Sequence, residues 1–292
     1  MRNVFTKLAT AMAFALMLTT NVQAAPKSNQ PQNNANNLSN KILFVEKEKA
    51  GSTYLSIVDP NGSNKKRLTP AFNNIIFPKY NDKSGWIAFT NQTDKMESEI
   101  YLLNKTGDKI MKVLTKAAFE DFSPDGKRFL YTTTDEKAEL YVYTIAAKTA
   151  VKISQNLKVT AASWSQDGDW IITSVMAEDG TLDLYMISCY AQGIFRMTNT
   201  PGVNEAFPSF SNDNLKAVYY TNRHGENELE IMGVGTHENL ALSRPMITGT
   251  HPSFSPDDKY VVYQQGDNIM VSDIGGLKSK KIATGKTPRW TK

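Results

Sequence analysis

The sequence is poor in the residues from which most catalytic and metal sites are built. Among 292 residues it has one cysteine, Cys189, and three histidines, His224, His237 and His251. A lone cysteine forms no intrachain disulfide and is most often a small buried side chain. The histidines are too scattered for a local metal pair, and neither His-Glu-x-x-His nor Cys-x-x-Cys occurs. We therefore expect no metal, no cofactor and no catalytic residue.

Motifs of two large enzyme classes are missing as well. Gly285-Lys286-Thr287 resembles the end of a phosphate-binding loop, but Lys280 stands where that loop requires glycine. No Gly-x-Ser-x-Gly is present to expose a serine nucleophile. Charge of one sign is also lacking, because the formal net charge is +4 and basic runs are as short as Lys65-Lys66-Arg67. Nucleic acid is therefore not an expected partner.

A long apolar run is found only near the N-terminus. Arg2 and Lys7 flank an apolar stretch over residues 8–18, and Val22-Gln23-Ala24 places small residues at the spacing of a cleavage site. The stretch is too short to span a bilayer, and no later segment approaches that length. We predict a signal peptide over residues 1–24. A periplasmic or secreted protein without membrane insertion follows, with a charge of +2 once Arg2 and Lys7 are removed.

Residues 25–40, APKSNQPQNNANNLSN, contain almost no large apolar side chain. Such a segment cannot bury enough surface to offset the entropy lost on ordering it. We predict a flexible polar leader, which serves either as a spacer or as a partner-binding tail.

The remainder of the chain is repetitive. A block of the type aromatic-Ser-x-Asp recurs with its aromatic residue at intervals of roughly 36 to 46 residues, and a proline often stands two positions earlier. A period in this range is typical of propeller blades or solenoid repeats. The six aromatic residues are Tyr80, Phe122, Trp164, Phe210, Phe254 and Trp290.

Each block leads into short runs of β-branched and aromatic residues separated by polar turns. The run Trp86 to Phe89 is followed by Ile100 to Leu103 and then Val113 to Thr115, as expected for consecutive strands. Four strands per repeat make one propeller blade, and the Asp-Gly pair suits the tight turn between the first two strands. The recurring aspartates are therefore expected to be turn residues.

The two ends of the chain complement each other. The first repeat lacks its block and begins directly at Ile42 to Val45, whereas Thr287 to Trp290 is a first strand with nothing after it. Pairing these two segments would complete a sixth blade and leave no open sheet edge. We predict an all-β, six-bladed propeller of four-stranded blades over residues 41–292, closed by its C-terminal strand.

The repeat resembles that of the TolB-like propeller family, over about Ile42 to Trp290. Tyr220 to Leu229 is similar to the family's Thr-Ser-Asp-Arg-x-Gly stretch, with Asn222 in place of aspartate. The resemblance implies protein recognition at the mouth of the propeller funnel. Members of the TolB type carry an α/β domain before the propeller, and here we expect only the polar leader in that place. The role of that domain is therefore not expected of this chain.

The loops that precede each first strand should line the funnel mouth, because blade sheets stand radially in a propeller. These loops differ from blade to blade, as a specific partner would require and as unconstrained loops would also show. His251 occupies the position held by Phe77 and Phe207 in other repeats, so it is either packed or mouth-lining. The candidate partner-binding residues are Lys116, Lys158, Glu205, His251 and Lys286.

The sequence favours a non-catalytic binding scaffold for a protein or peptide, acting as a monomer. A propeller enzyme is the alternative, a lyase or hydrolase acting on a polysaccharide or peptide, because acids and histidines from different blades could converge in space. A purely structural envelope protein is a third possibility. Nothing in the sequence supports a Ca²⁺ ion in the central channel.

Overall fold

A computed structural model describes residues 38–190, 193–236, 238–243, 251–276 and 278–292. The predicted signal peptide and most of the predicted leader lie outside these residues. All regular elements in the described part are β-strands, so it contains no helix that could cross a membrane.

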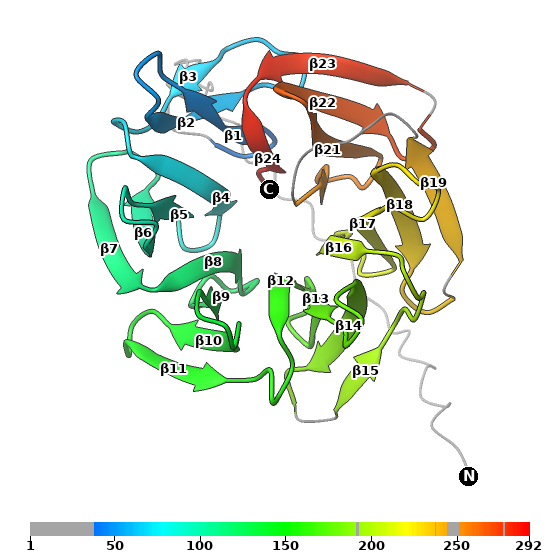
Figure 1. The fold of residues 1–292 in the computed structure, drawn as a ribbon. Helices are drawn as coiled ribbons and strands as arrows, with labels where there is room; N and C mark the ends of the chain where they lie inside the picture. Colours follow the sequence, from blue (N-terminus) through cyan, green and yellow to red (C-terminus); the bar gives the residue numbers. More distant parts are fainter. Residues whose placement is uncertain (1–37, 191–192, 237, 244–250, 277) are drawn as a thin grey trace, which may run out of the picture. The chain divides into compact units, whose positions relative to one another are not determined.

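Six four-stranded antiparallel sheets are arranged as blades around a central axis (Figure 1). The first strand of each blade lies nearest the axis and the fourth lies at the rim, which confirms the predicted propeller. In chain order, blades 1 to 6 are β24(Lys286–Trp290)-β1(Ile42–Lys47)-β2(Thr53–Val58)-β3(Lys66–Arg67); β4(Asn74–Asn81)-β5(Trp86–Gln92)-β6(Ser98–Asn104)-β7(Ile110–Thr115); β8(Ala117–Phe122)-β9(Arg128–Thr133)-β10(Leu140–Thr144)-β11(Thr149–Lys152); β12(Val159–Trp164)-β13(Trp170–Met176)-β14(Leu182–Ser188)-β15(Ile194–Arg196); β16(Glu205–Phe210)-β17(Lys216–Thr221)-β18(Glu228–Gly233)-β19(Asn239–Ser243); and β20(Ser253–Phe254)-β21(Tyr260–Gln265)-β22(Asn268–Asp273)-β23(Ser279–Thr284).

The hydrophobic core is divided among the interfaces between neighbouring blades. Inner strands such as β5 are buried on both faces, because each sheet is packed between two others. Phe44 of blade 1 packs with Val262 and Ile269 of blade 6, and Leu43 of the same strand packs with Phe89 of blade 2. Side chains that alternate along one strand thus join two different neighbours.

The repeated aspartates form turns, as predicted. Ser123 Oγ donates to Asp125 Oδ1 at 2.5 Å, and the amide of Lys127 donates to the same oxygen at 3.1 Å. Gly126 takes a φ of 68°, a conformation that favours glycine. These residues lie in the turn between β8 and β9, at the end of the inner strand.

The C-terminal strand closes the ring, as the orphan block predicted. β24 pairs antiparallel with β1, with Trp290 opposite Ile42 and Arg289 opposite Leu43. The Trp290 amide donates to Ser253 Oγ of blade 6 at 2.8 Å, so the strand joins both neighbours. Leu38, at the end of the predicted leader, is buried and belongs to the ring.

Bulges interrupt the inner strands where they reach the axis. Four positions just before a proline have a positive φ between 45° and 59°, which is uncommon for residues other than glycine: Phe77, Phe207, His251 and Thr287. Blades 3 and 4 lack this proline, and their bulges lie at Glu120 and Thr160 instead. A bulge changes the direction of one side chain, and here it brings side chains to the centre of the ring.

Candidate functional site

The ring has two faces, and the candidate residues belong to the one where the inner strands begin. We call this side the funnel face; the loops that enter β4, β8, β12, β16 and β24 lie there. The turns that carry the repeated aspartates lie at the other ends of the inner strands, on the opposite face.

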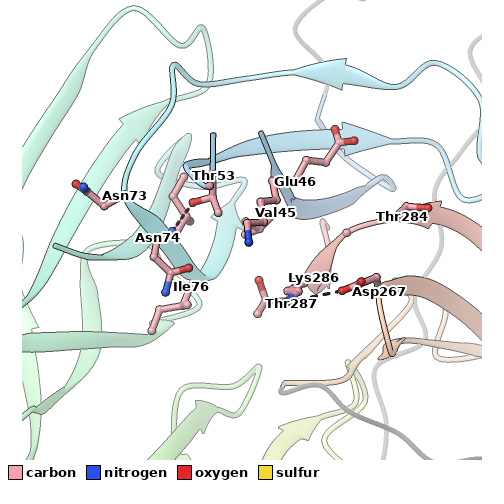
Figure 2. Close-up of a pocket in the computed structure, with 14 residues that line it drawn as sticks. Val45, Glu46, Thr53, Asn73, Asn74, Ile76, Asp267, Thr284, Lys286 and Thr287 are labelled. Atoms are coloured by element: carbon pink, nitrogen blue, oxygen red, sulfur yellow. Dashed lines mark hydrogen bonds and ion pairs between the residues drawn. The ribbon is translucent and has the colours of Figure 1, made fainter. Parts of the chain in front are cut away.

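A hollow of about 560 Å³ opens at the funnel face beside blade 1 (Figure 2). Its apolar lining comes from Val45, Ile75 and Ile76. Lys286 and Asp267 lie on one side with their charged groups 3.7 Å apart, both well exposed, and Asn73 and Asn74 lie across from them. The hollow therefore combines an apolar wall with a rim of both charges and amides.

A second hollow of about 920 Å³ lies at the same face beside blade 4. The exposed Lys158 and the half-exposed Met176 line it together with Arg196, whose guanidinium donates to the buried Asp183 at 2.6 Å. Lys116 is also exposed but lines neither hollow, and its backbone has a φ of 56°. Three of the five predicted residues thus present charge at the funnel face.

Glu205 is different, because it is fully buried. Its Oε1 accepts from Arg223 at 2.7 Å and from Thr200 at 3.1 Å, and burial raises the pKa of Glu205. Arg223 Nε also lies 3.4 Å from Glu230. Glu205 can therefore influence a partner only through the side chains that it holds.

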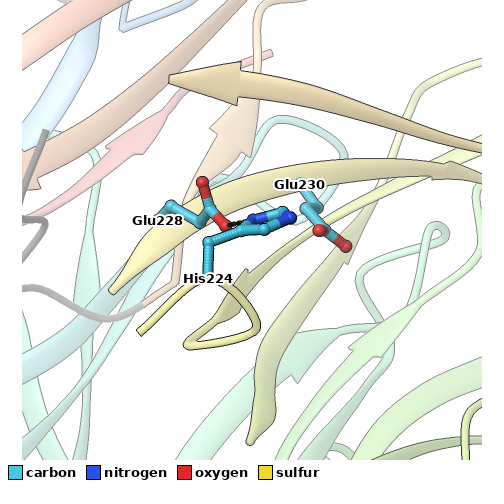
Figure 3. Close-up of side chains that lie close together, drawn as sticks. All are labelled: His224, Glu228 and Glu230. Carbon is cyan, nitrogen blue, oxygen red and sulfur yellow. Dashed lines mark hydrogen bonds and ion pairs between the residues drawn. The ribbon is translucent and has the colours of Figure 1, made fainter. Parts of the chain in front are cut away.

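The turn between β17 and β18 brings one imidazole and two carboxylates together (Figure 3). Ligand atoms of His224, Glu228 and Glu230 lie within 4.8 Å of one another, a donor set that zinc accepts. However, His224 is already paired with Glu228, while Arg223 and the Tyr219 hydroxyl are paired with Glu230, the latter at 2.6 Å. Both carboxylates therefore already have partners, which a metal would have to displace.

His251 lies at the centre of the ring and is 1% exposed. Its ring is 4.4 Å from that of Phe77 and 4.9 Å from that of Phe207, which come from blades 2 and 5. Blades 2, 5 and 6 are not all neighbours, so this contact closes the channel across its axis. Burial, with Arg289 and Lys79 nearby, holds the pKa of His251 well below its usual value.

Below this aromatic layer, one step along the inner strands, lies a group of buried charges. Lys79 forms an ion pair with Asp121, and Asp121 Oδ2 also accepts from Ser163 Oγ and from the Trp164 amide at 3.0 Å each. Lys79, Asp121, Ser163 and Arg289 occupy equivalent positions of blades 2, 3, 4 and 1, immediately before the repeat aromatic. They form part of one ring around the channel.

Glu120 is the extra residue of the bulge in β8 and is 1% exposed. Thr132 Oγ1 donates to its Oε1 at 2.8 Å and the Ala162 amide donates to its Oε2 at 3.2 Å. His251 Nε2 lies 3.6 Å from the same Oε2. Burial raises the pKa of Glu120 to about 8, so this carboxyl is largely protonated at neutral pH.

The channel charges were not among the residues singled out from the sequence. The sequence did contain a sign of them when the repeats are aligned. Glu120 stands where blades 2, 5 and 6 have proline, and the acidic Asp121 follows it. Arg289 stands where blades 4, 5 and 6 have serine. A charged residue inside a strand that is otherwise buried requires a partner. Comparing the repeats column by column would have found these positions.

The surroundings of Cys189 do not favour a reactive thiol. The side chain is half-buried beside the core of blade 4, and burial raises the pKa of its thiol to about 11. A thiol with that pKa is protonated at neutral pH and is a poor nucleophile.

Comparison with known proteins agrees with the architecture. The family model described as the TolB beta propeller domain matches residues 33–268. None of the curated proteins matches the sequence.

Solved structures give the same ring at low sequence identity. TolB from Acinetobacter baumannii is 21% identical with a TM-score of 0.76, covering 87% of this chain and 67% of that one. A putative TolB from Agrobacterium tumefaciens is 16% identical with a TM-score of 0.66, covering 85% and 90%. The tricorn protease is 12% identical with a TM-score of 0.64, covering 84% and 26%. Identities this low establish the fold alone.

Proposed function

The chain belongs to the TolB beta propeller domain family, and from this premise we propose that it is a non-catalytic scaffold that binds a protein or peptide at the funnel face. We place it in the periplasm or outside the cell, as a monomer. The segment predicted as a signal peptide and the periplasmic setting of the family support this location.

The observation that carries the proposal is the hollow beside blade 1. It combines an apolar wall, a lysine and an aspartate that are exposed, and two asparagine side chains within one opening of about 560 Å³. A protein surface is recognised by such a mixture, in which apolar contact supplies affinity and polar groups supply orientation.

The alternative is a propeller enzyme, and the tricorn protease illustrates that the same ring occurs in a proteolytic protein. The nearest approach to an acid–base pair at the channel is His251 Nε2 to Glu120 Oε2 at 3.6 Å. Both side chains are about 1% exposed, so a substrate could reach them only after Phe77 and Phe207 move. Turnover of a peptide or polysaccharide that is lost in both His251→Ala and a folded His251→Phe would favour the enzyme.

The scaffold proposal is tested by reversing charge at the funnel face. We expect Lys116→Glu, Lys158→Glu and Lys286→Glu, combined in one protein, to weaken capture of the partner at least tenfold in pull-downs from envelope extract. All three side chains are exposed, so the fold should be retained.

A matched control reverses three lysines that are also exposed, on the opposite face: Lys83, Lys127 and Lys259. Net charge changes by the same amount in both variants. Equal loss of capture in the two proteins, or no loss in either, would contradict recognition at the funnel face.

A further inference from the structure

Arg289 is a buried cation, and two of its guanidinium nitrogens have no hydrogen-bond partner in the described part of the chain. Its side chain is 2% exposed, and within the described residues neither Nε nor Nη1 meets an acceptor. Buried guanidinium groups are normally paired, because a charge removed from water without compensation is costly. Burial lowers the pKa of Arg289, but arginine remains protonated in proteins.

The two carboxyl groups of the channel attract this cation, but their hydrogen bonds are made with other groups. Asp121 is occupied by Lys79, Ser163 and the Trp164 amide. Glu120 is occupied by Thr132 and the Ala162 amide, and its raised pKa keeps it largely neutral. Among the side chains of Lys79, Glu120, Asp121 and Arg289, the positive charges therefore exceed the negative ones by one.

Other polar atoms near the axis share this condition. Thr287 Oγ1 lies two residues before Arg289 on β24, is buried and has no partner among the described residues. Both ring nitrogens of His251, in the adjacent blade, also lack a hydrogen-bond partner there. A hydroxyl and a neutral imidazole can each donate one hydrogen bond, so an acceptor placed between these blades would meet several donors.

We propose that the central channel binds a small monovalent anion against Arg289, with Thr287 and His251 as further donors. Chloride and a short carboxylate such as formate or acetate share the required chemistry, which is one negative charge and several accepting positions. The aromatic layer of Phe77, His251 and Phe207 lies between Arg289 and the funnel face, so the ligand must be small.

This inference does not depend on the proposed partner at the funnel face. The nearby charges also disfavour a cation such as Ca²⁺ at this point, because Lys79 and Arg289 would repel it and Asp121 is already paired with Lys79. The anion would instead neutralise the guanidinium of Arg289 on the closing strand β24, so its binding should stabilise the ring.

The first experiment measures the melting temperature in sodium salts of chloride, formate, acetate and gluconate at equal ionic strength. Gluconate is too large for the channel and serves as the reference. We expect chloride or a short carboxylate to raise the melting temperature by roughly 3 °C for each tenfold increase above its Kd. The salt that raises the melting temperature most identifies the anion that binds. Equal melting temperatures in all four salts would overturn the proposal.

Two variants localise the effect. Arg289→Gln should abolish the salt-specific shift, whereas Arg67→Gln, which changes a half-exposed arginine on β3, should keep it. A shift of the same size in Arg289→Gln would overturn the proposal.

A crystal of the unaltered protein grown in sodium bromide keeps the test independent of any variant that fails to fold. An anomalous bromine peak within hydrogen-bond distance of Arg289 is expected if a halide binds, and in formate a planar three-atom density is expected there. Water alone would give no anomalous peak in the bromide crystal and only spherical density in the formate crystal. That pair of results would refute the anion.

Discussion

Burial inside the ring changes the pKa of Glu120 strongly. The folded protein holds its proton up to about pH 8, whereas a glutamate in the unfolded chain releases it near its ordinary pKa of 4.5. Between these values the folded state binds more protons, so the contribution of Glu120 to stability falls as pH rises.

We therefore predict that Glu120→Gln is stabilised relative to the wild type as pH rises from 5 to 8. The difference in free energy of unfolding should change by on the order of 1 kcal/mol per pH unit. The neighbouring His251 has a lowered pKa and acts in the opposite direction below its ordinary value, but it is present in both proteins. Urea denaturation at several pH values measures the difference, and parallel pH profiles would disprove it.

His251 packs as its aromatic counterparts do. We predict that His251→Phe, measured in the gluconate reference salt, unfolds at the same temperature as the wild type or higher, because it removes two unpaired buried nitrogens while keeping contact with Phe77 and Phe207. His251→Ala should cost about 2–4 kcal/mol, because it leaves a cavity between those rings.

Thermal unfolding of both variants decides whether His251 is a packing residue. A His251→Phe protein that is as unstable as His251→Ala would show that the imidazole nitrogens matter. A stable His251→Phe protein that no longer captures a partner would instead support the prediction that His251 takes part in binding.

The channel charges could be predicted from the sequence only in part. Charges at positions 79, 120, 121 and 289 are visible as departures from the repeat. Which of them pair depends on bulges and on contacts between opposite blades, and a linear pattern contains neither. The positive φ values before proline illustrate the difficulty, because residues before proline usually adopt extended conformations.

At the scale of elements, β24 determines whether the ring is closed. Trp290 is 6% exposed and packs with Ile42, Phe44 and Val262. We predict that Trp290→Ala lowers the free energy of unfolding by about 3–5 kcal/mol, and that deletion of residues 287–292 destabilises the whole ring. Val151→Ala, on the rim strand β11 and 65% exposed, should change it by less than about 0.5 kcal/mol. A deletion with an unchanged melting temperature would contradict closure by this strand.

Gly285 gives a second test of the closing strand. A Cβ atom at this position would lie 2.5 Å from the Phe44 ring and 2.6 Å from the Val45 carbonyl oxygen, so Gly285→Ala must push β24 away from β1. Gly180 has a φ of 83° and no atom within 4 Å of such a Cβ. We predict that Gly285→Ala lowers the melting temperature by several degrees more than Gly180→Ala; the reverse order would indicate that β24 approaches β1 less closely.

The elements themselves were predictable because each repeat carries its own turn and strand signals. The Ser-x-Asp-Gly blocks identified the turns, and the unmatched ends of the chain predicted the pairing of β24 with β1. At the end of the predicted leader, Asn40 receives a hydrogen bond from the Trp290 indole at 3.1 Å. That contact joins residues far apart in the sequence, so composition alone could not indicate it.

At the scale of the whole molecule, the two faces of the ring differ in how they are built. One face consists largely of turns that recur between blades, with one hollow of about 430 Å³ beside Trp290, and the other has variable loops around two hollows. In a scaffold that recognises one partner, the loops that differ from blade to blade are expected to lie where the partner makes contact. This asymmetry is the basis for assigning recognition to the funnel face.

Site-specific photocrosslinking in cells that produce the protein tests this central claim most directly. A photoreactive residue at Asn73 or Lys286, beside the hollow of blade 1, is compared with one at Lys83 or Lys259 on the opposite face. We predict a discrete crosslinked protein, identifiable by mass spectrometry, from the funnel-face positions only. Crosslinks from the opposite face alone, or from neither face, would contradict the proposed function.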